Sequence, residues 1–181
     1  MSKLLRSSNQ GLSFLIVLIW GAAVLAGFWK LLTYANTPGA TASAHLRWPE
    51  GTHLYNSLDN SLDNSSPTLV MFVHPRCPCS EASIGELERL TPHIRNRVRS
   101  IIVFFKPKNK SDSWSKEKLW RKAQTIPGIT LVLDRDGLEA SHFGAKTSGQ
   151  AFLYDSNGNL VFSGGITPAR GHMGDSQGRD V

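Results

Sequence analysis

The chain has 181 residues, 40% of them hydrophobic and 19% charged, which is an ordinary composition for a folded protein and allows one domain plus an appendage. The formal net charge is +6. No nucleic-acid-binding motif occurs in the sequence, so we expect no nucleic-acid partner. An anionic membrane surface is the simpler partner for a basic protein that also carries an anchor.

The anchor is expected near the N-terminus. No charge occurs from Ser7 to Trp29, and these 23 positions form enough helix, at about 1.5 Å per residue, to cross a hydrocarbon core of roughly 30 Å. Lys3 and Arg6 precede the uncharged run. Positive charge before a span favours a cytoplasmic N-terminus and an exported remainder.

The predicted organisation has four parts: residues 1–34 as cytoplasmic N-terminus and transmembrane anchor, 35–66 as linker, 67–170 as folded domain, and 171–181 as glycine-rich C-terminal tail. We assign the membrane contact to residues 12–34 of a single-pass inner or plasma membrane protein with a periplasmic or otherwise extracytoplasmic domain. A cleaved signal peptide is the alternative, with Ala42-Ser43-Ala44 as the cleavage site. The apolar run is longer than such peptides usually carry, which favours the anchor.

The linker contains a four-residue repeat, Asn56-Ser57-Leu58-Asp59 followed by Asn60-Ser61-Leu62-Asp63. A repeat this short indicates a tolerated loop expansion. Before the repeat, the segment Leu46-Arg47-Trp48-Pro49 is expected to pack on the edge of the domain.

In the domain, the hydrophobic pattern predicts strands and helices in alternation. The expected elements are strands at 68–74, 99–106 and 130–134, helices at 80–95, 113–123 and 138–143, and a hairpin of 151–154 with 160–163 around an Asn-Gly turn. Strands that alternate with helices predict an α/β domain with a mixed, partly parallel sheet flanked by helices.

The only two cysteines, Cys77 and Cys79, stand between the first strand and the first helix of this domain. Pro78 suits the first helical position, where its missing N–H costs nothing. Free N–H groups and the partial positive charge of a helix N-terminus favour a thiolate, so we expect the pKa of Cys77 to lie below its usual value of about 8.5. Arg76, and His74 as an imidazolium at low pH, would add positive charge.

A strand, two nearby cysteines and a helix resemble the active-site segment of thioredoxin-like proteins, and the resemblance extends over roughly residues 68–165. It implies a thioredoxin-like mixed sheet with Cys77 at the nucleophile position. Cys79 comes one residue earlier than in the family's Cys-x-x-Cys pattern. Met71 falls where thioredoxins carry a buried Asp that assists proton transfer. The family's cis-proline falls at Gly149, where we expect a trans peptide because a cis bond before a non-proline is costly.

The motif His-Pro-x-Cys-Pro-Cys-Ser, the sequence Thr-Ser-Gly before the hairpin and the glycine-rich tail also resemble a group of anchored thioredoxin-like proteins labelled RedB. The RedB group itself implies little about mechanism, whereas the thioredoxin-like resemblance implies thiol–disulfide exchange on the exported side, without a cofactor, on protein thiols or disulfides. Cys77 would attack the substrate disulfide and Cys79 would resolve the mixed disulfide. A Cys-x-Cys disulfide closes a tight ring, and strain favours an oxidant or isomerase-like role over a strong reductant.

Two other functions stay open at the level of the sequence. The first is a copper-binding or copper-delivery module with Cys77, Cys79, His142 and His172 as ligands, because Cu(I) favours thiolates and accepts imidazole. The second is a degenerate domain that binds a partner without catalysis. The histidines and the lysines between 106 and 122 are, on the plainer interpretation, solvated surface residues.

Overall fold

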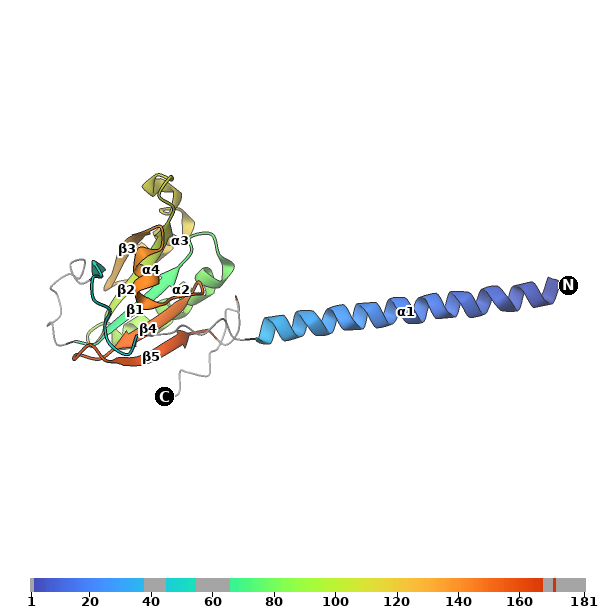
Figure 1. Ribbon diagram of the computed structural model, residues 1–181. Coiled ribbons are helices and arrows are strands. Elements are labelled where there is room, and N and C mark those ends of the chain that lie inside the picture. The colour runs from blue at the N-terminus through green and yellow to red at the C-terminus, as the bar shows by residue number, and fades with distance from the viewer. Residues whose placement is uncertain (1, 38–44, 55–65, 168–170, 172–181) are drawn as a thin grey trace. The chain divides into compact units, whose positions relative to one another are not determined.

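The computed structural model describes residues 2–37, 45–54, 66–167 and 171 (Figure 1). The chain forms two compact units, residues 1–37 and 38–181. The proposed cleavage site Ala42-Ser43-Ala44, the four-residue repeat and the tail from His172 onward lie outside the described residues.

The first unit is one helix, α1, which spans Ser2–Asn36. Its segment Gly11–Asn36 has a mean hydropathy of 2.3 and is long and apolar enough to cross a membrane. Large apolar side chains such as Ile16, Trp20 and Phe28 are exposed along it. The structure therefore confirms one apolar N-terminal helix. A signal sequence has the same length and composition, so anchoring stays a prediction.

The second unit is built on a five-stranded sheet with the order β3-β2-β1-β4-β5. Its strands are β1 Thr68–Val73, β2 Arg99–Lys106, β3 Ile129–Arg135, β4 Gln150–Tyr154 and β5 Leu160–Gly165. The pairs β1–β2 and β2–β3 are parallel, whereas β1–β4 and β4–β5 are antiparallel. This mixed sheet, with a helix between successive parallel strands and a final hairpin, is the thioredoxin-like arrangement that the sequence predicted.

The described helices of the domain are α2 Pro78–Ile94, the 3-10 turn η2 Asp112–Trp114, α3 Lys118–Gln124 and α4 Leu138–Phe143. The prediction of a single helix over 113–123 is wrong, because the helix is interrupted between η2 and α3. Ser115 is buried there and its hydroxyl donates a hydrogen bond of 3.0 Å to the carbonyl of Phe105 in β2. This bond holds the chain against the sheet and interrupts the helix.

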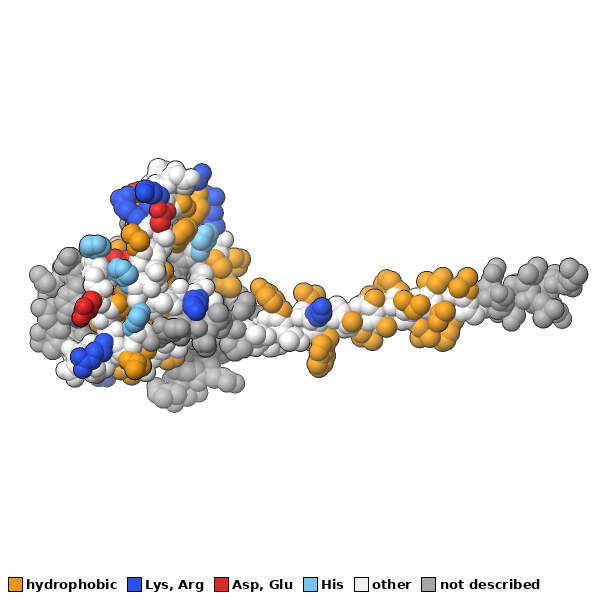
Figure 2. Space-filling model, viewed as in Figure 1, with side chains coloured by type: hydrophobic (Ala, Val, Ile, Leu, Met, Phe, Trp, Pro, Cys, Tyr) orange, Lys and Arg blue, Asp and Glu red, His pale blue; other side chains and the backbone are white. Residues whose placement is uncertain are grey.

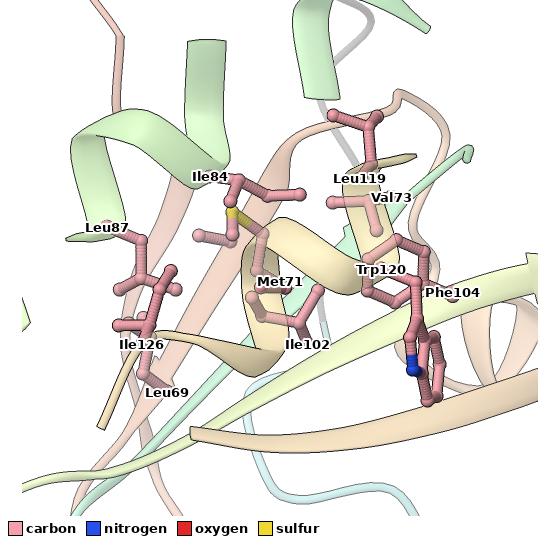
Figure 3. Packing of buried hydrophobic residues seen from close by; sticks show 12 residues of the cluster. Leu69, Met71, Val73, Ile84, Leu87, Ile102, Phe104, Leu119, Trp120 and Ile126 are labelled. Carbon is pink, nitrogen blue, oxygen red and sulfur yellow. The ribbon is translucent and has the colours of Figure 1, made fainter. Parts of the chain in front are cut away.

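Two apolar clusters cover opposite faces of the sheet. On one face, α2 and α3 pack on β1 and β2, and Figure 3 shows Met71 surrounded by Ile84, Ile102 and neighbouring side chains. The other face carries α4 and an aromatic cluster in which Phe72, Phe143, Phe152 and Tyr154 take part. Met71 is fully buried, so an apolar side chain occupies the position where the resemblance placed a buried Asp.

Part of the predicted linker packs on the α4 face through Trp48 and Leu54. The ring of Trp48 lies edge-on to Phe143 with a centroid distance of 5.1 Å, and its backbone N–H donates to the carbonyl of Gly158 at 2.8 Å. Leu54 is fully buried. Trp48 and Pro49 therefore pack on the domain as expected, whereas Leu46 and Arg47 are exposed.

Candidate functional site

The cysteine pair lies at the carboxyl end of β1, where the chain turns into α2. Cys77 is the residue that caps α2, with extended backbone angles, and Pro78 takes the first helical position. The carbonyl of Cys77 accepts hydrogen bonds from the N–H groups of Ser80 and Glu81 at 3.0 and 3.3 Å. The central strand of the sheet thus delivers Cys77 to a helix N-terminus, as the sequence predicted.

Both cysteines are free thiols and both are half-buried. Burial raises the pKa of Cys77, but hydrogen bonds from the backbone N–H groups of Ser80 and Cys79, the thiol of Cys79 and the hydroxyl of Ser148 outweigh it and bring the pKa below its ordinary value. The side chain of Cys77 makes no N-cap hydrogen bond to the backbone of α2 while the thiol is neutral. These donors therefore act mainly once the sulfur is ionised, and they agree with the predicted direction of the shift.

The charges predicted to help the thiolate have other partners. The Arg76 guanidinium lies 2.8 Å from Glu117 and 4.7 Å from the ring centroid of Trp114. His74 stacks on Phe105, and its Nδ1 accepts the backbone N–H of Arg76 at 3.3 Å. Burial lowers the pKa of His74, and the nearby Arg76 lowers it further, so the imidazolium forms only at more acidic pH than usual. The structure assigns the lowered Cys77 pKa to hydrogen bonds and not to Arg76.

Two serines, which no pattern in the sequence marked as functional, complete the site. The backbone N–H of His74 donates to Ser148 Oγ at 2.7 Å and to Ser80 Oγ at 3.2 Å. The Ser80 hydroxyl donates to the carbonyl of His74 at 2.8 Å and also contacts Ser148 Oγ. Because Ser80 gives its one hydrogen to that carbonyl, Ser148 is the donor toward either Ser80 Oγ or the sulfur of Cys77.

Gly149 explains how Ser148 comes so close to α2. Its φ is +88°, and a Cβ at this position would lie 2.3 Å from Ser83 Oγ. Its N–H donates to the carbonyl of Phe72 at 2.7 Å, a bond that proline could not make. The described residues contain no cis peptide, as expected for this turn. The resemblance places the family's cis-proline at Gly149. Ser148 directly precedes this position, and that was the one signal in the sequence that could have identified it.

The residues of the copper hypothesis are not all brought together. His142 belongs to α4, and its Cε1 lies 3.8 Å from the position that a Cβ on Gly51 would take. The neighbouring Phe143 packs in the cluster on the sheet face opposite to α2. His172 lies outside the described residues. Within the described part of the chain, no group of three or more His, Cys, Asp or Glu side chains could hold a metal ion.

No protein-family model matches the chain, and no curated protein matches it either. An uncharacterized conserved protein from Geobacillus kaustophilus has a similar solved structure, with a TM-score of 0.50, 16% identity, and coverage of 78% of this chain and 75% of that chain. For a hypothetical protein from Sinorhizobium meliloti the TM-score is 0.49, the identity 23%, and the coverage 77% and 76%.

A third similar structure is that of a secreted Mycobacterium tuberculosis disulfide oxidoreductase homologous to E. coli DsbE. Its TM-score is 0.48, its identity 18%, and the match covers 63% of this chain and 76% of that chain. Identities at this level speak to the fold alone. Fold and site together define a thioredoxin-like domain with two free thiols, spaced by one residue, at the junction of its central strand and α2.

Proposed function

We propose that the protein carries out thiol–disulfide exchange through Cys77 and Cys79. The observation that supports this most directly is the position of Cys77 at the N-terminus of α2, where hydrogen bonds to the sulfur lower its pKa. A thiolate, and not a thiol, attacks a disulfide. One of these hydrogen bonds comes from the thiol of Cys79, so the second sulfur of the exchange is already within hydrogen-bonding reach of the first.

In the proposed reaction, the Cys77 thiolate attacks one sulfur of a substrate disulfide and the other substrate sulfur leaves as a thiolate. Cys79, deprotonated, then attacks the Cys77 sulfur of the mixed disulfide. The second substrate thiol is released and a Cys77–Cys79 disulfide remains. Two electrons have passed to the substrate, and the same steps in reverse oxidise a substrate dithiol. The strain expected of a Cys-x-Cys ring favours the oxidising direction, and no cofactor takes part.

We place this chemistry on the exported side of a membrane, with residues 12–34 as the anchor and the N-terminus in the cytoplasm. The apolar helix and the positive charges before it support this topology. A reporter fused after Val181 should be active only outside the cytoplasm, and cytoplasmic activity would overturn the topology. Membership of the RedB-like group stays a prediction.

The test of the exchange is a trapping experiment with single variants. Cys79→Ser removes the resolving sulfur, so mixed disulfides should accumulate on Cys77, whereas Cys77→Ser should accumulate few or none. Equal trapping by both variants would reverse the assigned order. If the site binds copper instead, either variant should lose Cu(I) and trap nothing. A domain that only binds a partner would neither trap disulfides nor bind copper.

A further inference from the structure

Most of the excess positive charge of this protein comes from one short segment beside the site. Residues 106–122 run from the end of β2 into α3 and carry seven cationic side chains against two carboxylates, a net charge of +5, while the whole chain has +6. The cationic residues are Lys106, Lys108, Lys110, Lys116, Lys118, Arg121 and Lys122. Clustered charges of one sign produce a local potential that attracts groups of the opposite charge.

Five of these cations are exposed, namely Lys108, Lys110, Lys116, Lys118 and Arg121, and we call these five residues the basic surface. Figure 2 shows Lys and Arg side chains gathered at the end of the domain where Figure 1 draws α3. Lys106 is excluded because it is buried and pairs with Asp112 at 3.0 Å.

The basic surface adjoins the cysteine pair. The turn with Cys77 follows β1 and the basic segment follows β2, and these parallel neighbours end at the same edge of the sheet. Two ion pairs join the segments, from Glu117 to Arg76 at 2.8 Å and from Lys118 to Glu81 at 3.0 Å. The basic surface therefore meets the start of α2 at Lys118, beside the turn that carries Cys77.

The carboxylates nearby cancel only part of this charge. Asp112 is shared between Lys106 at 3.0 Å and Lys116 at 3.9 Å, and Glu117 pairs with Arg76. Glu81 and Glu88 pair with Lys118 and Lys122, and Asp136 accepts the backbone N–H of Lys108. The salt bridges found in the described parts of the chain include none with Lys108, Lys110 or Arg121. Ion pairs at an exposed surface are weak, so three unpaired cations beside half-neutralised ones leave a positive surface.

We propose that the basic surface docks an acidic partner protein, one that carries Asp and Glu residues next to the disulfide that Cys77 attacks. This inference rests on the proposed exchange reaction and adds the substrate class. A protein is favoured over a lipid surface because the basic surface lies next to Cys77, whose partner must contain sulfur. Complementary charge raises association rates by about 10 to 1,000-fold, and salt screens it over a Debye length of about 10 Å at 0.1 M.

The test uses the reduced full-length chain in non-ionic detergent and two synthetic peptide disulfides that differ only in flanking Asp or Lys residues. At low salt the acidic peptide should react at least about tenfold faster than the basic one, and the gap should close in about 0.5 M salt. The pair Lys108→Glu/Lys110→Glu should abolish or reverse the preference. The pair Arg95→Glu/Arg97→Glu changes the net charge equally, just after α2 ends, and should leave the preference intact.

The outcomes separate this inference from the function on which it rests. Exchange with both peptides at equal rates would overturn the acidic-partner inference and leave the exchange reaction standing, whereas no reaction with either peptide would remove the exchange reaction itself. An equal loss in both charge-reversal pairs would also overturn the inference, because net charge and not the basic surface would then be responsible. A third result would overturn the inference and assign the basic surface to the membrane. In that case the exchange rates would not depend on peptide charge, and nanodiscs of anionic, but not neutral, lipid would protect Lys108 and Lys110 from acylation.

Discussion

Replacing Ser148 with Ala should raise the pKa of Cys77. The Ser148 hydroxyl is one of the four hydrogen-bond donors that hold this pKa below its ordinary value. Alanine removes that donor while the backbone N–H groups of Cys79 and Ser80 stay in place. The His74 N–H, which loses its 2.7 Å acceptor, keeps Ser80 Oγ at 3.2 Å, so the turn before Cys77 retains one of its two bonds.

The size of the effect follows from the strength of a hydrogen bond to a charged group, which is about 1.5–3 kcal/mol when buried. Each pKa unit corresponds to about 1.4 kcal/mol. Cys77 is only half-buried, so water can replace part of the lost bond and the lower end of the range applies. We therefore expect an upward shift of about one pKa unit.

The shift is measured from the pH dependence of alkylation in the Cys79→Ser background, where Cys77 is the only thiol. Ser148→Thr keeps a hydroxyl and should shift the midpoint little. Thr147→Ala is the matched control, because the neighbouring Thr147 hydroxyl faces Gln150 at 3.5 Å instead of the sulfur.

Two results would refute this reasoning. If the Ser148→Ala midpoint moves no further than that of the Thr147→Ala control, Ser148 does not stabilise the thiolate. If alkylation without either substitution already rises only around pH 8.5 or above, Cys77 is not an activated nucleophile and the proposed exchange loses its main support.

The remaining predictions concern stability, read from urea unfolding of the solubilised chain. Gly149→Ala should cost about 2 kcal/mol or more, because φ is +88° and the new Cβ meets Ser83 Oγ at 2.3 Å; adding Ser83→Ala should restore part of the loss, and no restoration would rule out this clash. Phe143→Ala should cost about 3–5 kcal/mol, since the side chain is fully buried among aromatic rings; a loss below about 1 kcal/mol would mean that this face is not a core. Burial raises the pKa of Asp134 above 3.8, with help from the charge of Glu139 and against the effect of hydrogen bonds. The free energy of unfolding should therefore fall as the pH rises through the range just above 3.8. Asp134→Asn should lack this pH dependence, and an unchanged dependence would contradict the assignment.

The sheet could be predicted because its strands are recognisable from short stretches of the sequence. β1 and β2 are nearly continuous apolar runs that are buried on both faces, and the Asn-Gly turn identifies the final hairpin. The break between η2 and α3 could not be predicted in this way. It depends on a hydrogen bond from Ser115 to the carbonyl of Phe105, which exists only once the segment lies on the sheet.

The same division holds for the site. Cys77 and Cys79 are visible in the sequence because two thiols, a proline and a strand–helix junction coincide. Ser148 is not, because its hydroxyl meets Ser80 across 68 residues of chain and only through the close approach at Gly149. The position of Arg76 one residue before Cys77 predicts a contact with the sulfur, whereas its actual partner, Glu117, is 41 residues away.

The two serine hydroxyls also connect the sulfur to the backbone. A thiolate accepts the Ser148 hydrogen more strongly than a thiol or a disulfide does, so each change at Cys77 alters how Ser148 and Ser80 share their contacts with His74. The His74 amide lies between both oxygens. Its NMR chemical shift should therefore report the oxidation state of the cysteine pair directly, without a label attached to either sulfur.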